Sequence, residues 1–149
     1  MMRIYLDVCC LNRPFDDLSQ DRVRLESEAV LTVLSRCQSG KWNLIGSEAI
    51  LLEIRKMPDT ERRDKVLFLS SITSSFITVD IHIEKRGMEI EKMGIRSFDA
   101  MHIACAEKAN ADILLTTDDD LLRKIRLNRD RIKVRIENPI NWLAEVIHT

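Results

Sequence analysis

The sequence has few of the residues that interrupt or cross-link a chain, with 4 glycines, 3 prolines and 4 cysteines among its 149 residues. So little glycine and proline excludes collagen-like repeats and long low-complexity tails. The cysteines form no C-x-x-C pair, so a structural zinc site is not indicated and we predict reduced, mostly buried thiols. No apolar run approaches the roughly 18 residues needed to span a membrane. The N-terminus, MMRIYLDVCC, also lacks the long apolar segment of a signal peptide, so we expect a cytoplasmic protein without membrane contact.

What is present indicates a compact folded chain. A composition of 45% hydrophobic and 32% charged residues suits one hydrophobic core, and we expect residues 1–149 to form a single domain. The net charge of -1 gives by itself no reason to expect a polyanionic partner. Its distribution is more informative, because residues 123–135 carry seven basic side chains and one acidic one. This basic stretch either contacts nucleic acid or solvates a helix and an edge strand.

Short apolar runs alternate with segments of helical period, which predicts parallel βα units. Strands are expected at residues 3–6, 42–46, 76–79, 112–116 and 132–136. Helices are expected at 21–39, 48–57, from about 60, at 83–93, 98–109, from about 121, and after 139. The predicted fold is therefore α/β, a three-layer α/β/α sandwich around a parallel five-stranded sheet. Four aromatic residues are expected to pack in the core: Trp42, Phe68, Phe98 and Trp142.

Four carboxylates are expected at one edge of this sheet. Asp7 and Asp118 directly follow strands, and Glu53 and Asp99 lie early in helices that could start from the same edge. In open parallel sheets, ligands bind at the carboxyl ends of the strands. Converging carboxylates repel one another and are costly to desolvate, so they favour a bound cation. Oxygen ligands favour Mg²⁺ or Mn²⁺ over zinc, and such an ion can promote phosphodiester hydrolysis.

Each of these acids also has a structural interpretation. Asp7 could cap a turn between a strand and a helix, and Asp118 could be the N-cap of the next helix. Asp99 could simply stabilise its helix through the helix dipole. Glu48 is an alternative to Glu53, although we favour Glu53.

Other polar residues lie near the four acids. Asp120 is a second candidate ligand, whereas Asp119 is expected to face water. His102, three residues after Asp99, could support a ligand, although a helix histidine that is merely hydrogen-bonded is more common. Arg13, shortly after the first strand, is a candidate for phosphate binding.

Three segments, IYLDVCCLNRPFDD, GSEAILLEIRKM and IRSFDAMHIACAEKANADILLTTDDDLL, resemble the PIN domain family. The resemblance spans most of the chain and implies a Mg²⁺- or Mn²⁺-dependent endoribonuclease. Similarity to VapC-type toxins within this family further implies an RNA substrate, an antitoxin partner and a homodimer.

The resemblance also assigns roles to individual residues. The implied catalytic acids, in the patterns YLD, LLE, SFDAMHIACA and LLTTD, are Asp7, Glu53, Asp99 and Asp118. The implied metal ligands are Asp7, Asp99, Asp118 and the auxiliary acid Asp120. Thr116 or Thr117 would be the small hydroxyl beside Asp118, and Thr116 is a candidate for substrate binding together with Arg13.

Two other classes of protein compete with a nuclease. The first is a PIN-like module that binds RNA or protein without catalysis, and the presence of all four acids speaks against it. The second is an aspartate phosphatase or receiver-like domain. A phosphatase needs D-x-D after the first strand, where this chain has Asp7, Val8 and Cys9. A receiver needs a lysine after its last strand, and Lys133 falls inside the expected strand instead.

Overall fold

The computed structural model describes residues 1–147, whose centre is a parallel sheet of five strands in the order β3-β2-β1-β4-β5. The strands are β1 Arg3–Leu6, β2 Asn43–Ser47, β3 Ser75–Ile77, β4 Ile113–Leu115 and β5 Ile136–Glu137. The chain adds β2 and β3 on one side of β1 and then crosses to add β4 and β5 on the other. This reversal of direction lies between β1 and β4, which is where ligands bind in doubly wound sheets.

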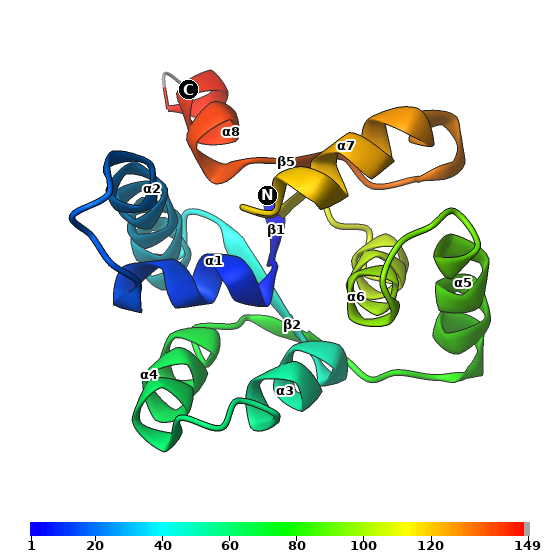
Figure 1. Ribbon diagram of the computed structural model, residues 1–149, viewed down its shortest axis with the longest axis horizontal. Helices are drawn as coiled ribbons and strands as arrows, with labels where there is room; N and C mark the ends of the chain where they lie inside the picture. The colour runs from blue at the N-terminus through cyan, green and yellow to red at the C-terminus, as the bar shows by residue number, and fades with distance from the viewer. Residues whose placement is uncertain (148–149) are drawn as a thin grey trace.

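Helices cover both faces of the sheet, as expected for parallel βα units. In Figure 1, α2 and α4 lie on one side of β1 and β2, and α5 and α6 lie on the other. The longer helices are α2 Asp21–Gln38, α3 Glu48–Arg55, α4 Thr60–Ser70, α5 Ile81–Glu91, α6 Ser97–Lys108, α7 Asp119–Leu127 and α8 Pro139–Val146. The short ones are α1 Val8–Asn12 and the 3-10 turns η1 Arg13–Phe15 and η2 Arg129–Arg131. The predicted three-layer α/β/α fold is confirmed.

The residues that end three of the helices were readable from the sequence. Gly40 and Gly94 follow α2 and α5 with φ angles of 84° and 88°, and Asn110 follows α6 with a φ of 53°. Glycine and asparagine adopt this left-handed conformation more easily than other residues, so they terminate helices. Among residues 1–147, no helix combines the length and the apolar character that crossing a bilayer requires.

Some boundaries differ from the expectation. The segment after β1 forms α1, which was not predicted because five residues are too few to reveal a helical period. The last strand begins only at Ile136 instead of residue 132. The backbone N–H of Lys133 donates to the Glu107 carboxylate, 2.7 Å away, and this bond to α6 takes the place of a strand-ladder bond. Ser97 is the first residue of α6, and Arg96 occupies the N-cap position without a side-chain bond.

The core is formed mainly by the strands and the inner helix faces. Trp42 and Trp142 are buried as predicted and meet edge to face, with ring centroids 5.2 Å apart. The prediction for Phe68 was wrong, because this residue is 73% exposed on the outer surface of α4. Apolar period alone does not reveal which turn of a helix lacks a packing partner. All four cysteines are free thiols, as predicted, but only Cys10 and Cys105 are buried, and Cys9 and Cys37 are half-buried.

Candidate active site

Asp7 directly follows the carboxyl end of β1, and its side chain is only 6% exposed. Its Oδ1 accepts from the backbone N–H of Val8, 2.8 Å away, and thereby caps α1. Its Oδ2 accepts from the Thr116 hydroxyl at 2.9 Å and from the Cys9 thiol at 3.4 Å. The parallel pairing of β1 with β4 creates these contacts, since the Asp7 backbone N–H donates to the carbonyl of Leu115. Asp7 is therefore both a helix cap and a carboxylate held in a defined position.

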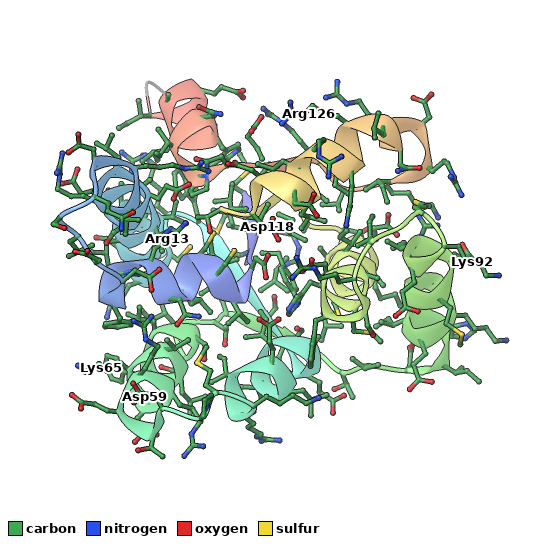
Figure 2. The ribbon with its side chains drawn as sticks, viewed as in Figure 1. Arg13, Asp59, Lys65, Lys92, Asp118 and Arg126 are labelled. Carbon is green, nitrogen blue, oxygen red and sulfur yellow. The ribbon has the colours of Figure 1, made fainter. Side chains whose placement is uncertain are left out.

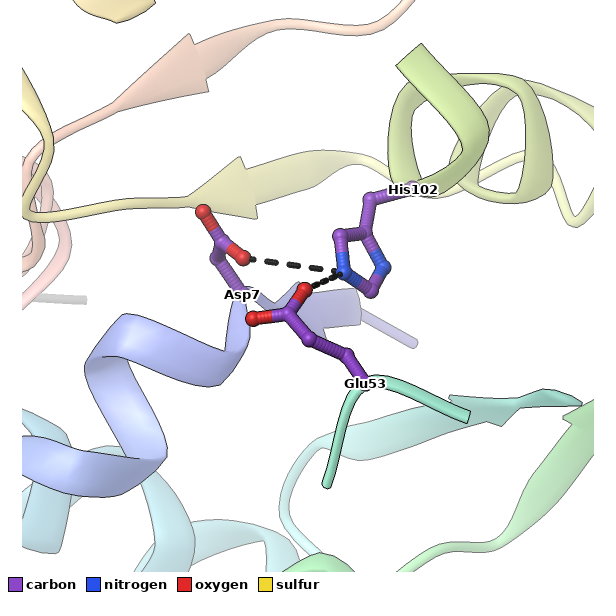
Figure 3. A group of neighbouring side chains, drawn as sticks. All are labelled: Asp7, Glu53 and His102. Atoms are coloured by element: carbon purple, nitrogen blue, oxygen red, sulfur yellow. Dashed lines mark hydrogen bonds and ion pairs between the residues drawn. The ribbon is translucent and has the colours of Figure 1, made fainter. Parts of the chain in front are cut away.

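Glu53 and His102 approach Asp7 from two helices, as Figure 3 shows. The Glu53 Oε1 lies 2.7 Å from the His102 Nε2, and the same nitrogen lies 3.8 Å from the Asp7 Oδ1. One ligand atom from each of the three residues lies within 4.8 Å of the other two. Glu53 was expected early in its helix but lies in the last half of α3, which is short enough to keep this end near the site. Glu48 instead accepts from the backbone N–H of Val79, 2.6 Å away.

Asp99 lies in the first turn of α6 and is half-buried. Burial, and then the nearby charge of Asp7, raises the pKa of the Asp99 carboxyl to about 6. Asp118 and Glu53 act in the same direction, whereas His102 opposes them. Asp99 lies one helical turn before His102, whose Nε2 faces the carboxylates of Glu53 and Asp7. Asp118 and Asp7 are both bonded to the Thr116 hydroxyl. The structure thus brings Asp7, Glu53, Asp99 and Asp118 to one edge of the sheet.

Asp118 is the N-cap of α7, where its Oδ1 accepts from the backbone N–H groups of Asp120 and Leu121. Its own backbone N–H donates to the Thr116 hydroxyl, 3.2 Å away, which links it to Asp7. The structural interpretation of Asp118 as a cap therefore holds, and its second carboxylate oxygen, Oδ2, is not used in this cap. In Figure 2, Asp118 lies at the start of α7 near the middle of the molecule.

The two acids that follow Asp118 belong to ion pairs. Asp119 is exposed and binds Arg22 through two bonds of 2.6 and 2.7 Å. Asp120 pairs with Lys124 at 3.0 Å and with Arg123, and these cations lower the pKa of its carboxyl. Asp120 is bound in these ion pairs, and its role as a metal ligand stays a prediction.

Arg13 and Thr116 both contact acidic groups. The Arg13 guanidinium binds Asp16 and Glu26, each at 2.9 Å. Glu26 is fully buried and also accepts from the side-chain amide of Asn138 at 2.6 Å. Arg13 therefore ties η1 to α2, and a direct contact with phosphate stays a prediction. Thr116 is also fully buried, and its hydroxyl supports Asp7, so its contact with a substrate stays a prediction too.

The residues that sequence reasoning missed are Tyr5 and Cys9. Tyr5 lies on β1 two residues before Asp7, and in extended backbone this spacing puts both side chains on one face of the sheet. Cys9 was expected to be an ordinary buried thiol, yet it contacts the Asp7 carboxylate. His102 is hydrogen-bonded to both Tyr5 and Glu53, so the expected hydrogen-bonded helix histidine is confirmed, and its support of a metal ligand stays a prediction. Burial lowers the pKa of His102, but the carboxylates of Glu53 and Asp7 outweigh this effect and raise it.

The basic stretch of residues 123–135 lines a cleft of about 730 Å³ between α7 and the segment that leads into β5. Its cationic lining residues are Arg126, Arg129, Lys133 and Arg135. Arg135 is bound to Glu145 through two bonds of 2.6 and 2.9 Å. In Figure 2, Arg126 lies on the half of α7 that is remote from Asp118. The cleft is therefore separate from the acidic group, and its contact with nucleic acid stays a prediction.

Comparison with known proteins identifies the family. Residues 4–127 match the PIN domain, and the chain belongs to the PIN domain family. No curated protein matches the chain closely. Three solved structures share its fold: VapBC2 from Rickettsia felis bound to a DNA fragment from its promoter, FitAcB from Neisseria gonorrhoeae, and VapBC-1 from nontypeable Haemophilus influenzae.

The likeness to these three structures covers almost the whole of each chain. It spans 92%, 91% and 93% of this chain and 98%, 97% and 98% of theirs, in that order. The TM-scores are 0.56, 0.56 and 0.55, with 17%, 15% and 14% sequence identity. At this identity the comparison establishes the fold, and function has to be argued from the site.

Proposed function

We propose that the protein is a metal-dependent endoribonuclease that hydrolyses phosphodiester bonds of RNA with Mg²⁺ or Mn²⁺. The observation that carries the proposal is the convergence of four acids from four separate segments. The raised pKa of Asp99, to about 6, reflects burial and the repulsion among them. A divalent cation would relieve this repulsion, because it replaces like-charge contacts by attraction.

The donor set fits such a cation. Asp7, Asp99 and Asp118 supply carboxylate oxygens, which are the ligands that Mg²⁺ and Mn²⁺ prefer. Asp7 is buried and held by its bonds to Val8 and Thr116, so it can offer its carboxylate with little loss of conformational entropy on binding. When bound, a divalent cation stabilises charge on the phosphate oxygens and lowers the pKa of a water molecule. Glu53, whose carboxylate lies near that of Asp7, would share the same cation.

The partners belong to the same proposal. The likeness to VapBC2 and VapBC-1 supports a role as the toxin of a type II toxin-antitoxin pair, with an antitoxin protein as partner. A homodimer and a cytoplasmic location are proposed with it. The alternative, a PIN-like module that binds RNA or protein without cutting, has no observation in its favour and becomes an outcome of the test.

The test is cleavage of labelled single-stranded RNA in Mn²⁺ or Mg²⁺ by wild type, Asp7→Asn and Asp99→Asn. Asp64→Asn is the matched control, since Asp64 is exposed on α4. We expect both site variants to lose at least about 100-fold in rate, because each lost 1.4 kcal/mol of charge stabilisation costs about tenfold. Asp64→Asn should cut normally, and chelation should stop all cutting. RNA binding without any cleavage by wild type would favour the alternative module.

A further inference from the structure

His102 is a fully buried polar residue whose two ring nitrogens both have partners. It lies on α6 three residues after Asp99, so both side chains project from the same face of the helix. Its Nε2 lies 2.7 Å from the Glu53 Oε1, and its Nδ1 lies 2.7 Å from the Tyr5 hydroxyl oxygen. The imidazole therefore connects the strand that carries Asp7 to the helix that carries Glu53.

The direction of these hydrogen bonds follows from donor and acceptor chemistry. An ionised carboxylate only accepts, so the Nε2 of His102 must carry the hydrogen that is donated to Glu53. In a neutral ring, Nδ1 is then an acceptor and receives the Tyr5 hydroxyl, whose pKa burial raises well above its ordinary value. Ser47, 2.7 Å from the Tyr5 oxygen, can donate to it while accepting from the backbone N–H of Ile50. The hydrogen bonds thus run from Ser47 through Tyr5 and His102 to Glu53, and each hydroxyl and ring nitrogen along this series has a partner.

Packing fixes the plane of the imidazole as well. The Tyr5 ring meets it edge to face with centroids 5.6 Å apart, and the Phe98 ring stacks on it at 6.4 Å. Lys56 covers the Phe98 ring at 5.0 Å. The ring of His102 therefore cannot turn without disturbing these neighbours, and its Nε2 has a defined place.

Glu53 is different, because it has a long flexible side chain that remains 30% exposed. Within residues 1–147, the Glu53 side chain hydrogen-bonds to His102 alone. Without that bond, its carboxylate would be free to swing away from Asp7, driven by the repulsion between two negative charges. Figure 3 shows the same imidazole nitrogen facing both the Glu53 and the Asp7 carboxylate.

We propose that His102, held by Tyr5, is a positioning residue that keeps the Glu53 carboxylate beside Asp7 for a shared divalent cation. This inference rests on the proposed function in one respect, the binding of a cation by the acidic group. It assigns a role to His102, which is not one of the four acids: holding the Glu53 carboxylate in position. Outer partners of metal ligands generally matter in this way, and their loss lowers metal affinity by about 10- to 100-fold.

The test is a titration of the metal-free protein with Mn²⁺ in the absence of RNA, in which calorimetry measures the affinity. His102→Gln places an amide nitrogen near the original Nε2, whereas His102→Asn places one near Nδ1 and His102→Leu places none. We expect Leu and Asn to weaken Mn²⁺ binding by about 10- to 100-fold and Gln to restore it to within a few-fold of wild type. Tyr5→Phe should weaken binding less than His102→Leu. His82→Gln, on the exposed surface of α5, is the control and should bind as wild type does.

Two further measurements distinguish a positioning role of His102 from a purely structural role and from direct metal coordination. Urea unfolding of each variant measures its stability, so a variant that binds poorly because it is unfolded is recognised. Comparison of the folded His102→Gln and His102→Asn variants then shows whether the position of the amide nitrogen determines Mn²⁺ affinity. Electron spin echo spectra of bound Mn²⁺ report direct nitrogen coordination. Equal affinity of Gln, Asn and Leu would overturn the inference, as would strong nitrogen coupling that is lost in the variants, since His102 would then be a ligand itself. Absence of Mn²⁺ binding by wild type would overturn it too, whereas binding in the expected order without RNA cleavage would reject only the nuclease proposal.

Discussion

Replacing Asp99 by asparagine should make the metal-free protein more stable at neutral pH. Asparagine is close in shape to the protonated carboxyl and carries no charge. In the folded protein the pKa of Asp99 is raised from 3.8 to about 6, so its charged form is disfavoured relative to the unfolded chain. The wild type therefore folds at pH 7 with an unfavourable charge beside Asp7, and the variant does not.

The size of the effect follows from the two pKa values. The difference between 3.8 and about 6 corresponds to about 3 kcal/mol, because one pKa unit is worth about 1.4 kcal/mol. Asp99 is only partly buried, so solvent screens its charge and we expect a gain of about 1–2 kcal/mol in the free energy of unfolding. The sign follows from linkage: the penalty is absent below pH 3.8, grows as the pH rises towards 6, and is constant above it.

The assay is urea unfolding in a chelating buffer at pH 7 and near pH 4. The fluorescence of the buried Trp42 and Trp142 monitors the transition. We expect Asp99→Asn to exceed wild type in stability at pH 7 and to match it near pH 4. Added Mn²⁺ should reverse the order at pH 7, because the wild type binds the ion more tightly and gains more from it. Two results would refute the reasoning about repulsion among the four acids: a variant less stable than wild type at pH 7, or a stability difference between the two proteins that is the same at pH 7 and pH 4.

Two further predictions concern regions outside the site. Glu26→Ala should lower the free energy of unfolding by about 3 kcal/mol, because it leaves the buried amide of Asn138 and the half-buried guanidinium of Arg13 without their acceptor. The exposed Glu28→Ala on the same helix should change it by less than about 0.5 kcal/mol, and equal effects would argue against the buried ion pair. If the basic cleft contacts RNA, replacing Arg126, Arg129 and Lys133 together by alanine should reduce the slope of log affinity against log salt by about 2. An unchanged slope would mean that the cleft does not bind RNA.

The positions of Asp7 and Asp118 were predictable because strand ends are visible in the sequence, whereas the place of Glu53 within its helix was not. An apolar run that stops at an aspartate indicates the carboxyl edge of a parallel sheet, as for Asp7 and Asp118. The pairing of Leu6 with Leu115 then brings these two ends together. The sandwich architecture followed from the alternation of strands and helices.

Other features depend on three-dimensional contacts that no local pattern encodes. The role of Arg13 was one, since its partner Glu26 lies in a different helix and is fully buried. The contact of Tyr5 with His102 was another, because the two residues are 97 positions apart. The late start of β5 reflects a bond from Lys133 to α6.

The central claim is that acids from distant segments form one cation site around Asp7. Its most direct test is a Mn²⁺ titration of metal-free wild type, Asp7→Asn and the surface control Asp64→Asn. We predict saturable binding by wild type and the control, and binding weaker by about 10-fold or more in Asp7→Asn. Equal affinity in all three proteins, or no binding by wild type, would contradict the claim.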